Sequence, residues 1–348
     1  MERTAESRQQ IKIMPKIELH LHLEGAFNFD FLFRLIEKYG GDPSVRSTAD
    51  LQKKFVFRDF PHFIELWFWK NQFFKTPADF EESTYHTIKD LASQQVNYAE
   101  LFFSPWDFIA NQLRVEEITE ATLSGIRRAE KDFPIRCNLI ADLVRDYGAA
   151  GAIDRLDQIT PFLQSGVIGI GLGGSEQKFP AQDFSEVFRE ARRRGFHLTA
   201  HAGEASGAES VWAAVKELGV ERIGHGVRAI EDPKLIEYLK TQQIPLEVCV
   251  TSNIKTRVFK SLSAHPLPVL LEKGLVVTIN SDDPAMFGSN LTEEMILLHE
   301  KMDLSLISLQ RLMKNALEAS FLSTTEKFEL RKYFPSEKTG TASFSNPC

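Results

Sequence analysis

Short apolar runs rich in β-branched residues recur along this chain, and helical stretches separate them. Amphipathic segments such as 184–194 and 208–218 have the spacing of helices that bury one face. Eight strands that alternate with helices predict an α/β fold, a closed (β/α)8 TIM barrel. A doubly wound open sheet is the alternative, but no Gly-x-Gly-x-x-Gly motif follows the first strand. The expected strands lie near 17–22, 98–103, 137–144, 167–172, 197–201, 222–225, 246–251 and 275–280.

A helical insertion separates the first two expected strands, roughly from residue 28 to residue 92. It is too long for one crossover helix, and its middle is unusually aromatic. Phe63 and Trp67 are four residues apart and therefore share one face of a helix. This face either packs on the barrel or forms a lid that touches a flat apolar ligand. Insertions after barrel strands fall on the catalytic face, so both interpretations stay open.

The length and composition fit one large domain. The chain has 348 residues, of which 43% are hydrophobic, and an α/β barrel of about 250 residues or more is routinely a single domain. We expect this barrel to span residues 12–335, after an N-terminal tail at 1–11. Residues 336–348 are rich in Ser, Thr, Gly and Pro without periodicity, which predicts a flexible tail.

Charge and cysteine content exclude several classes of protein. The net charge of −7 argues against a nucleic-acid binder, which normally carries a basic face. The sequence has neither an apolar signal core nor a run of about 18 apolar residues, so we expect no membrane partner. Three scattered cysteines form no disulfide framework or metal knuckle, which favours a reducing, cytoplasmic setting.

Polar side chains cluster at the ends of several expected strands. His20 and His22 alternate within the first strand and therefore point to the same face. His201 ends the fifth strand, and Asp282 follows the eighth. Strand ends meet at the mouth of a barrel, where three imidazoles and a carboxylate can hold one catalytic metal ion. No lysine ends the fourth strand to bridge a second ion, because the strand ends in the run Gly-Leu-Gly-Gly at 171–174.

Three further residues beside these expected ligands are candidate proton carriers. Glu204 follows His201 by three residues, and a carboxyl group near a metal can shuttle protons when its pKa is raised. Glu204 is alternatively the cap of the next helix. His225 stands between two glycines, which either give its ring room or reflect tight packing. Asp283 offers a second acceptor beside Asp282.

In this order, the clusters resemble the adenosine deaminase family of the metal-dependent amidohydrolases, which includes adenosine, adenine and aminodeoxyfutalosine deaminases. The resemblance covers residues 15 to 291 through the motifs HLHLEG at 20–25, TAHAGE at 199–204, IGHG at 223–226 and SDDP at 281–284. It implies a (β/α)8 barrel with one zinc ion held by His20, His22, His201 and Asp282. It also implies a hydrolase acting on C–N bonds of cyclic amidines, in which a metal-activated hydroxide adds to C6 of a 6-aminopurine and ammonia leaves.

The resemblance also implies roles for residues around the metal. Glu204 would protonate purine N1, His225 would orient and deprotonate the attacking water, and Asp283 would bind the hydroxide or purine N7. Gly174 would donate its backbone N–H to purine N3. The apolar gate of the family would fall at Phe63 and Trp67.

One departure from the family pattern concerns the substituent on purine N9. Adenosine deaminases usually carry Asp where this chain has Glu24, and that Asp binds the ribose 5′-hydroxyl. We expect an adenosine-like nucleoside as substrate, with free adenine and aminodeoxyfutalosine as alternatives. AMP is disfavoured because no basic pocket is evident beside the HLHLEG run. Another amidohydrolase reaction and a non-catalytic binding barrel are more remote alternatives, and the oligomeric state stays open.

Overall fold

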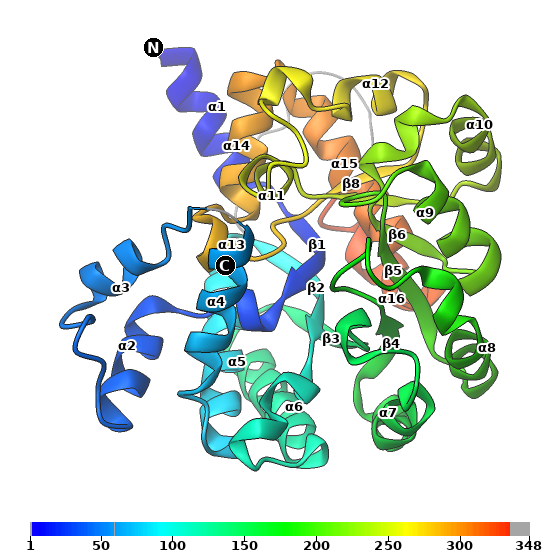
Figure 1. Ribbon diagram of the computed structural model, residues 1–348. Coiled ribbons are helices and arrows are strands. Elements are labelled where there is room, and N and C mark those ends of the chain that lie inside the picture. Colours follow the sequence, from blue (N-terminus) through cyan, green and yellow to red (C-terminus); the bar gives the residue numbers. More distant parts are fainter. Residues whose placement is uncertain (1, 59, 335–348) are drawn as a thin grey trace.

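The computed structural model describes residues 2–58 and 60–334 and shows the predicted barrel. Eight strands pair in parallel in the order of the sequence, with helices around them (Figure 1). The last strand returns to the first through a parallel bridge between Leu21 and Asp282. The (β/α)8 prediction is therefore confirmed, whereas the tail predicted at 336–348 lies outside the described residues. The strands are β1 Lys16–His22, β2 Val96–Phe103, β3 Arg136–Asp142, β4 Val167–Gly171, β5 His197–Ala202, β6 Arg222–His225, β7 Leu246–Val248 and β8 Val277–Ile279.

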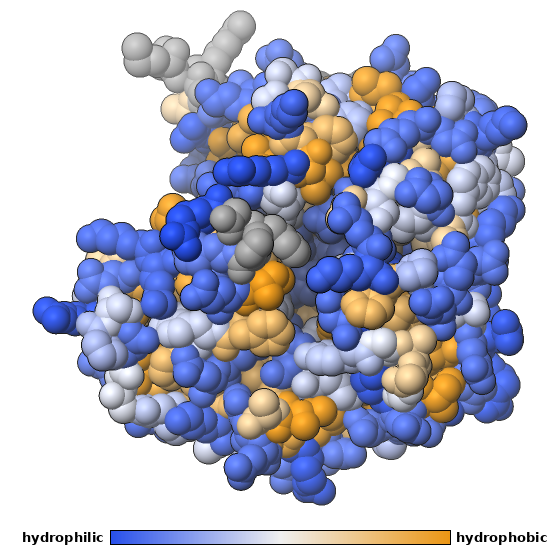
Figure 2. All heavy atoms as spheres, in the orientation of Figure 1, coloured by the Kyte–Doolittle hydropathy of each residue, from blue (hydrophilic) through white to orange (hydrophobic). Residues whose placement is uncertain are grey.

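Helices follow the strands and cover the outside of the barrel (Figure 1). No helix of the described residues has both the length and the hydropathy needed to cross a bilayer. The face shown in Figure 2 is mostly hydrophilic, with hydrophobic side chains in separate patches. The helices are α1 Glu2–Ile13, α2 Phe29–Lys38, α3 Thr48–Lys54, α4 Phe60–Asn71, α5 Pro77–Ser93, α6 Val115–Asp132, α7 Ala152–Ile159, α8 Ser185–Arg194, α9 Ala208–Ala213, α10 Pro233–Gln242, α11 Val250–Lys255, α12 Leu267–Glu272, α13 Pro284–Phe287, α14 Leu291–Lys301, α15 Leu306–Ala319 and α16 Thr324–Arg331.

The predicted insertion contains α2, α3 and α4, which lie beside the barrel, and α5, which leads into β2 (Figure 1). Its aromatic residues form a small hydrophobic core separate from that of the barrel. Phe55, Phe63 and Phe74 belong to this second core and are each less than a tenth exposed. Phe287 of α13 packs in the same cluster, so the insertion is anchored directly behind the residues that follow β8.

A helix occupies the stretch where the sequence suggests an N-terminal tail. Ile11 of α1 is fully buried in the barrel core, and Arg8 Nη2 donates to Glu300 Oε2 of α14 at 2.8 Å. The segment has few apolar residues, so its sequence lacks the periodicity that marks a packed helix. The buried isoleucine and the ion pair are among the contacts that attach α1 to the fold.

Candidate metal centre and active site

The ends of β1, β5 and β8 bring the four predicted metal ligands together. His22 Nε2 lies 3.1 Å from His201 Nε2 and 3.4 Å from Asp282 Oδ1. His20 Nε2 lies 3.5 Å from the same Asp282 oxygen. Two ligand atoms bound to a tetrahedral ion at about 2.0–2.1 Å are about 3.3 Å apart, so this spacing is that of a single-metal site.

The protonation of two of these residues, His22 and His201, also fits a metal ion. Burial lowers the pKa of His22 to about 3 and holds the pKa of His201 well below its usual range. Both rings are therefore neutral and present lone pairs, as metal ligands must. His20 Nε2 is buried and has no hydrogen-bond partner among the described residues. A cation at the point where these nitrogens converge would satisfy all three rings.

The backbone around the site adopts left-handed conformations that non-glycine residues rarely take. The φ angles of Asp282 and His225 are 62° and 59°. The Asp282 N–H donates to the His20 carbonyl, and the His22 N–H donates to the Asp282 carbonyl, both at 2.9 Å. These bonds fix Asp282 beside β1 and sustain a conformation that costs about 1–3 kcal/mol.

A buried chain of charges supports His20 inside the barrel. Glu247 Oε2 lies 2.8 Å from His20 Nδ1, and Arg222 Nε donates to Glu247 Oε1 at 2.5 Å. Arg222 Nη2 lies 2.5 Å from Glu100 Oε2, and all of these side chains are almost completely buried. Although burial acts in the opposite direction, Arg222 and His20 hold the pKa of Glu247 below its usual range. The carboxylate therefore fixes the His20 ring with Nε2 directed at the metal position.

His225 lies between the ligand cluster and Glu204. Its Nε2 is 3.5 Å from Glu204 Oε2 and 3.8 Å from Asp282 Oδ2. On the other side of the ring, the Asn253 side-chain amide lies 3.1 Å from Nδ1, and Asn253 is itself bonded to His265. When the amide donates to Nδ1, the neutral imidazole carries its proton on Nε2, facing the site.

The loop that carries Glu204 is held by a second carboxylate, Glu176. Glu176 accepts hydrogen bonds from the N–H groups of Gly203, Glu204 and Ser206 at 2.6, 3.2 and 2.8 Å. Burial raises the pKa of Glu204 to about 8, and the negative charges of Asp282 and Glu176 add to the effect. Glu204 is therefore a carboxyl group that keeps its proton at neutral pH beside a metal position.

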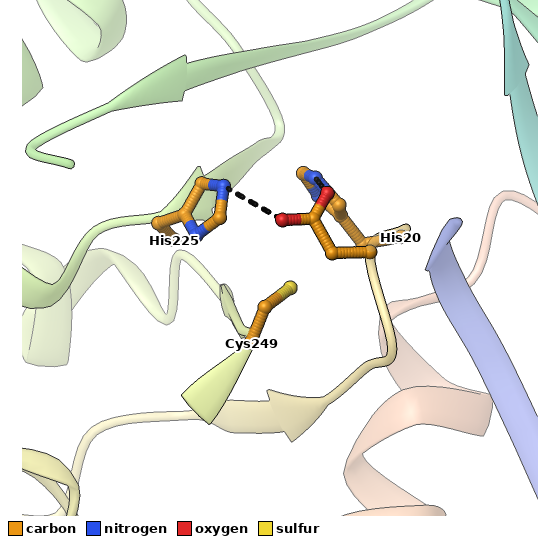
Figure 3. Close-up of side chains that lie close together, drawn as sticks. His20, His225 and Cys249 are labelled. Carbon is orange, nitrogen blue, oxygen red and sulfur yellow. Dashed lines mark ion pairs between the residues drawn. The ribbon is translucent and has the colours of Figure 1, made fainter. Parts of the chain in front are cut away.

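Cys249 is a neighbour that the sequence analysis leaves out. Its side chain points toward the space between His20 and His225 (Figure 3). Donor atoms of Cys249, His20, His225 and Asp282 all lie within 4.8 Å of one another. The thiol follows β7, and an apolar strand-like run in the sequence gives no sign that it borders the metal site.

Two predicted substrate contacts lie next to the cluster. Glu24 Oε1 accepts the Ser104 N–H at 2.7 Å, whereas Glu24 Oε2 is buried without a partner among the described residues. Asp283 is 6% exposed, and its Oδ1 also lacks a partner there. Gly25 packs so closely on Asp283 that a Cβ on it would collide with the carboxylate. Both carboxyl groups thus offer a free acceptor.

The remaining predicted contacts lie farther out. Gly174 is exposed on the loop after β4, with a φ of +89°. Phe63 stacks on Phe287 with ring centroids 5.5 Å apart, and Trp67 donates its indole N–H to Asp107 at 2.9 Å. The structure therefore fixes both aromatic rings on α4, with Phe63 packed against α13 just beyond Asp283.

Comparison with known proteins identifies the family. The family model described as adenosine deaminase matches residues 15–334. An adenine deaminase of Crocosphaera subtropica is 35% identical over 92% of this chain and 98% of its own length. An aminodeoxyfutalosine deaminase of Streptomyces avermitilis is 36% identical over 90% of this chain and 88% of its own length. A crystal structure of an amidohydrolase from Burkholderia ambifaria with bound Zn has a TM-score of 0.87 at 26% identity, covering 94% of this chain and 91% of that one. The predicted resemblance is thereby confirmed: the chain belongs to the adenosine deaminase family and is a hydrolase acting on C–N bonds of cyclic amidines.

Proposed function

We propose that this protein is a zinc-dependent deaminase that converts a 6-aminopurine into the 6-oxopurine and releases ammonia. The observation that carries the proposal is a half-buried Glu204 with a raised pKa beside four converging candidate metal ligands. His20, His22, His201 and Asp282 would hold the ion, as the spacing of their donor atoms supports. Bound zinc lowers the pKa of water from about 15.7 towards 7.

The residues of the chain supply the proton transfers. Glu204 holds a proton at neutral pH and would donate it to purine N1, which makes C6 electrophilic. His225 would orient the attacking water through Nε2, the atom that faces Glu204 and Asp282. Asp283 would accept a hydrogen bond from the water or face purine N7, through an oxygen that has no other described partner.

The purine itself would be held by residues of three loops. Gly174 would donate its N–H to purine N3, and its φ of +89° suits a backbone that a planar ring approaches closely. Phe63 and Trp67 of α4 would cover the ring, because α4 packs against the segments that follow β1 and β2. Glu24 would face the N9 side with its unpartnered Oε2.

Adenosine is the first substrate to test, and free adenine is the second. The adenosine assignment follows the family motifs, whereas adenine is favoured by Glu24 and by the adenine deaminase of Crocosphaera subtropica. Aminodeoxyfutalosine belongs in the same panel because a relative from Streptomyces avermitilis carries that activity in its name.

The test is a deamination assay with zinc-loaded protein. We expect an ultraviolet shift towards the 6-oxo product, together with stoichiometric ammonia, for at least one of the three compounds. Glu204→Gln should lower kcat by about 10²–10⁴-fold without loss of bound zinc. The control is Glu186→Gln, which alters an exposed carboxylate on α8. An inactive wild-type enzyme, or full activity of Glu204→Gln, would refute the proposal.

A further inference from the structure

Lys70 is a buried lysine at the end of α4, the helix that packs against the segments after β1 and β2. Its side chain is 1% exposed, although lysines are almost never fully buried unless they are paired. Its Nζ lies 2.6 Å from Asn71 Oδ1 and 4.1 Å from the centroid of the Trp67 ring. No carboxylate of the described residues forms an ion pair with it within 4.0 Å. The chain therefore buries a cation at α4 without neutralising it directly.

The charges that Lys70 faces are those of the active-site mouth. Carboxyl groups of Glu24, Asp107 and Asp283 all act on the ammonium electrostatically. They follow β1, β2 and β8, and Asp283 directly follows a predicted metal ligand. Burial lowers the pKa of Lys70 to about 8 and raises the pKa of Glu24 to about 7. Lys70 thus lies between the aromatic core of the insertion, on which Trp67 packs, and the carboxyl groups that form the polar wall of the site.

Several polar atoms of this wall lack partners among the described residues. Glu24 Oε2 is a buried acceptor without a donor, and Asn71 Nδ2 is a buried donor without an acceptor. Asn71 is only 3% exposed. The ammonium of Lys70 has three N–H groups, of which one is used by Asn71 Oδ1. Buried polar groups in native proteins are normally satisfied, so this set calls for a polar ligand.

The balance of donors and acceptors indicates what kind of ligand fits. On the side opposite its amino group, a free 6-aminopurine offers N3 as an acceptor and N9–H as a donor. If N3 accepts the Gly174 N–H, the free base has only N9–H left on this side, and that donor can serve Glu24. Lys70 and Asn71 then remain without an acceptor. A hydroxyl group both accepts and donates, so a sugar on N9 could satisfy all three residues. Three carboxyl groups against one ammonium leave no surplus positive charge for a phosphate.

We propose that Lys70 and Asn71, together with Glu24, form a subsite for a hydroxylated N9 substituent and so make the enzyme select aminopurine nucleosides over free bases. The inference rests on the proposed function and deepens it by naming the substrate class. Lys70 and Asn71 are specificity-determining residues that act by hydrogen bonding the sugar, not by taking part in proton transfer.

The experiment compares kcat/KM for adenosine and adenine in wild type, Lys70→Met, Asn71→Leu and the control Lys53→Met. Lys53 is an exposed lysine of α3 in the same insertion. We expect Lys70→Met and Asn71→Leu to lower the adenosine-to-adenine ratio of kcat/KM by at least about tenfold, chiefly through KM for adenosine. The control should leave the ratio unchanged.

A second measurement needs no variant and covers the case in which Lys70→Met fails to fold. Wild-type kcat/KM is measured for 2′-, 3′- and 5′-deoxyadenosine, and at least one should fall about tenfold or more below adenosine. Three results would overturn the subsite. The variants could lose kcat/KM equally for adenine and adenosine, the wild type could have the higher kcat/KM for adenine, or the wild type could act on all three deoxynucleosides as well as on adenosine. A wild type inactive on every 6-aminopurine would instead refute the proposed function.

Discussion

At the scale of single residues, Gly224 stands where any side chain would meet a metal ligand. A Cβ there would lie 2.8 Å from His20 Cε1 and 3.2 Å from His201 Cα. The His20 ring is held from behind by Glu247, so it cannot turn aside without breaking that bond. We expect Gly224→Ala to weaken zinc binding about 10–100-fold, as loss of an outer-shell contact does, measured by competition with a chelator. Gly40→Ala is the control, because an added Cβ there would have no atom within 4 Å. Unchanged zinc affinity in Gly224→Ala would contradict the clash with His20.

The pH dependence of the reaction follows from Glu204. Its carboxyl group has a pKa raised to about 8 by burial, with Asp282 and Glu176 adding to the effect. The protonated form is the one that can donate to N1, and it is lost as the pH rises through 8. We therefore expect kcat/KM to fall about tenfold per pH unit above this pKa, in a profile recorded from pH 6 to 10. A flat profile between pH 7 and 10 would remove Glu204 from its proposed role.

At the scale of elements, alternation of strand and helix is enough to predict the barrel, and strand ends are enough to predict that the three histidines and Asp282 converge. His20 and His22 could be recognised because strand geometry itself places them on one face. Strand lengths were less predictable. The run at 246–251 is mostly apolar, yet β7 ends at Val248 and α11 begins at Val250. A short buried run does not distinguish strand from helix, so the hydrophobic pattern could not show this boundary.

The supporting residues could not be predicted for a different reason. Glu247, Glu176 and Asn253 act through partners that are distant in the sequence, such as Glu247 on His20, 227 positions away. No local spacing in the sequence indicates such a pair. A single acidic residue in a strand-like run is typical of a turn or of an exposed strand face. The burial of Lys70 could not be predicted either, because the aromatic residues around it in the sequence indicate only a packed helix.

A buried lysine, Lys16, also holds the end of α1 on the barrel. Lys16 Nζ donates to the carbonyl oxygens of Ile11, Met14 and Gln94, each at 2.8 Å, and Lys16 is fully buried. Lys16→Met would leave these carbonyls unsatisfied, and we expect the free energy of unfolding to fall by about 1–3 kcal/mol. Thermal unfolding measures the loss, with the exposed Lys12→Met as control. Equal melting temperatures for the two variants would show that the lysine does not hold α1.

At the scale of the whole molecule, the proposed metal site joins parts of the barrel that are far apart in the sequence. His20 and Asp282 are neighbours in space across the β1–β8 closure, and His201 lies on β5. The barrel is closed there by the Leu21–Asp282 bridge and the backbone hydrogen bonds of Asp282. Side-chain bonds add to the closure: the Leu19 N–H donates to Asn280 Oδ1, and Ser281 donates to Glu18. A cation bound by all three segments would therefore tie the last strand to the first.

Zinc removal should consequently destabilise the fold as well as abolish activity. A ligand that binds only the folded state stabilises it by RT ln(1 + [L]/Kd), about 2.7 kcal/mol at a hundredfold excess over Kd. We expect the chelated protein to melt at a lower temperature and to recover as zinc is added back. Glu247→Gln keeps the shape of the side chain but loses the charge that orients His20, so its recovery should require about 10–100-fold more zinc. If apo and zinc-loaded protein melt at the same temperature, the four residues do not bind the ion as a unit. If the melting temperature of Glu247→Gln recovers at the same zinc concentration as the wild type, the buried carboxylate does not position His20.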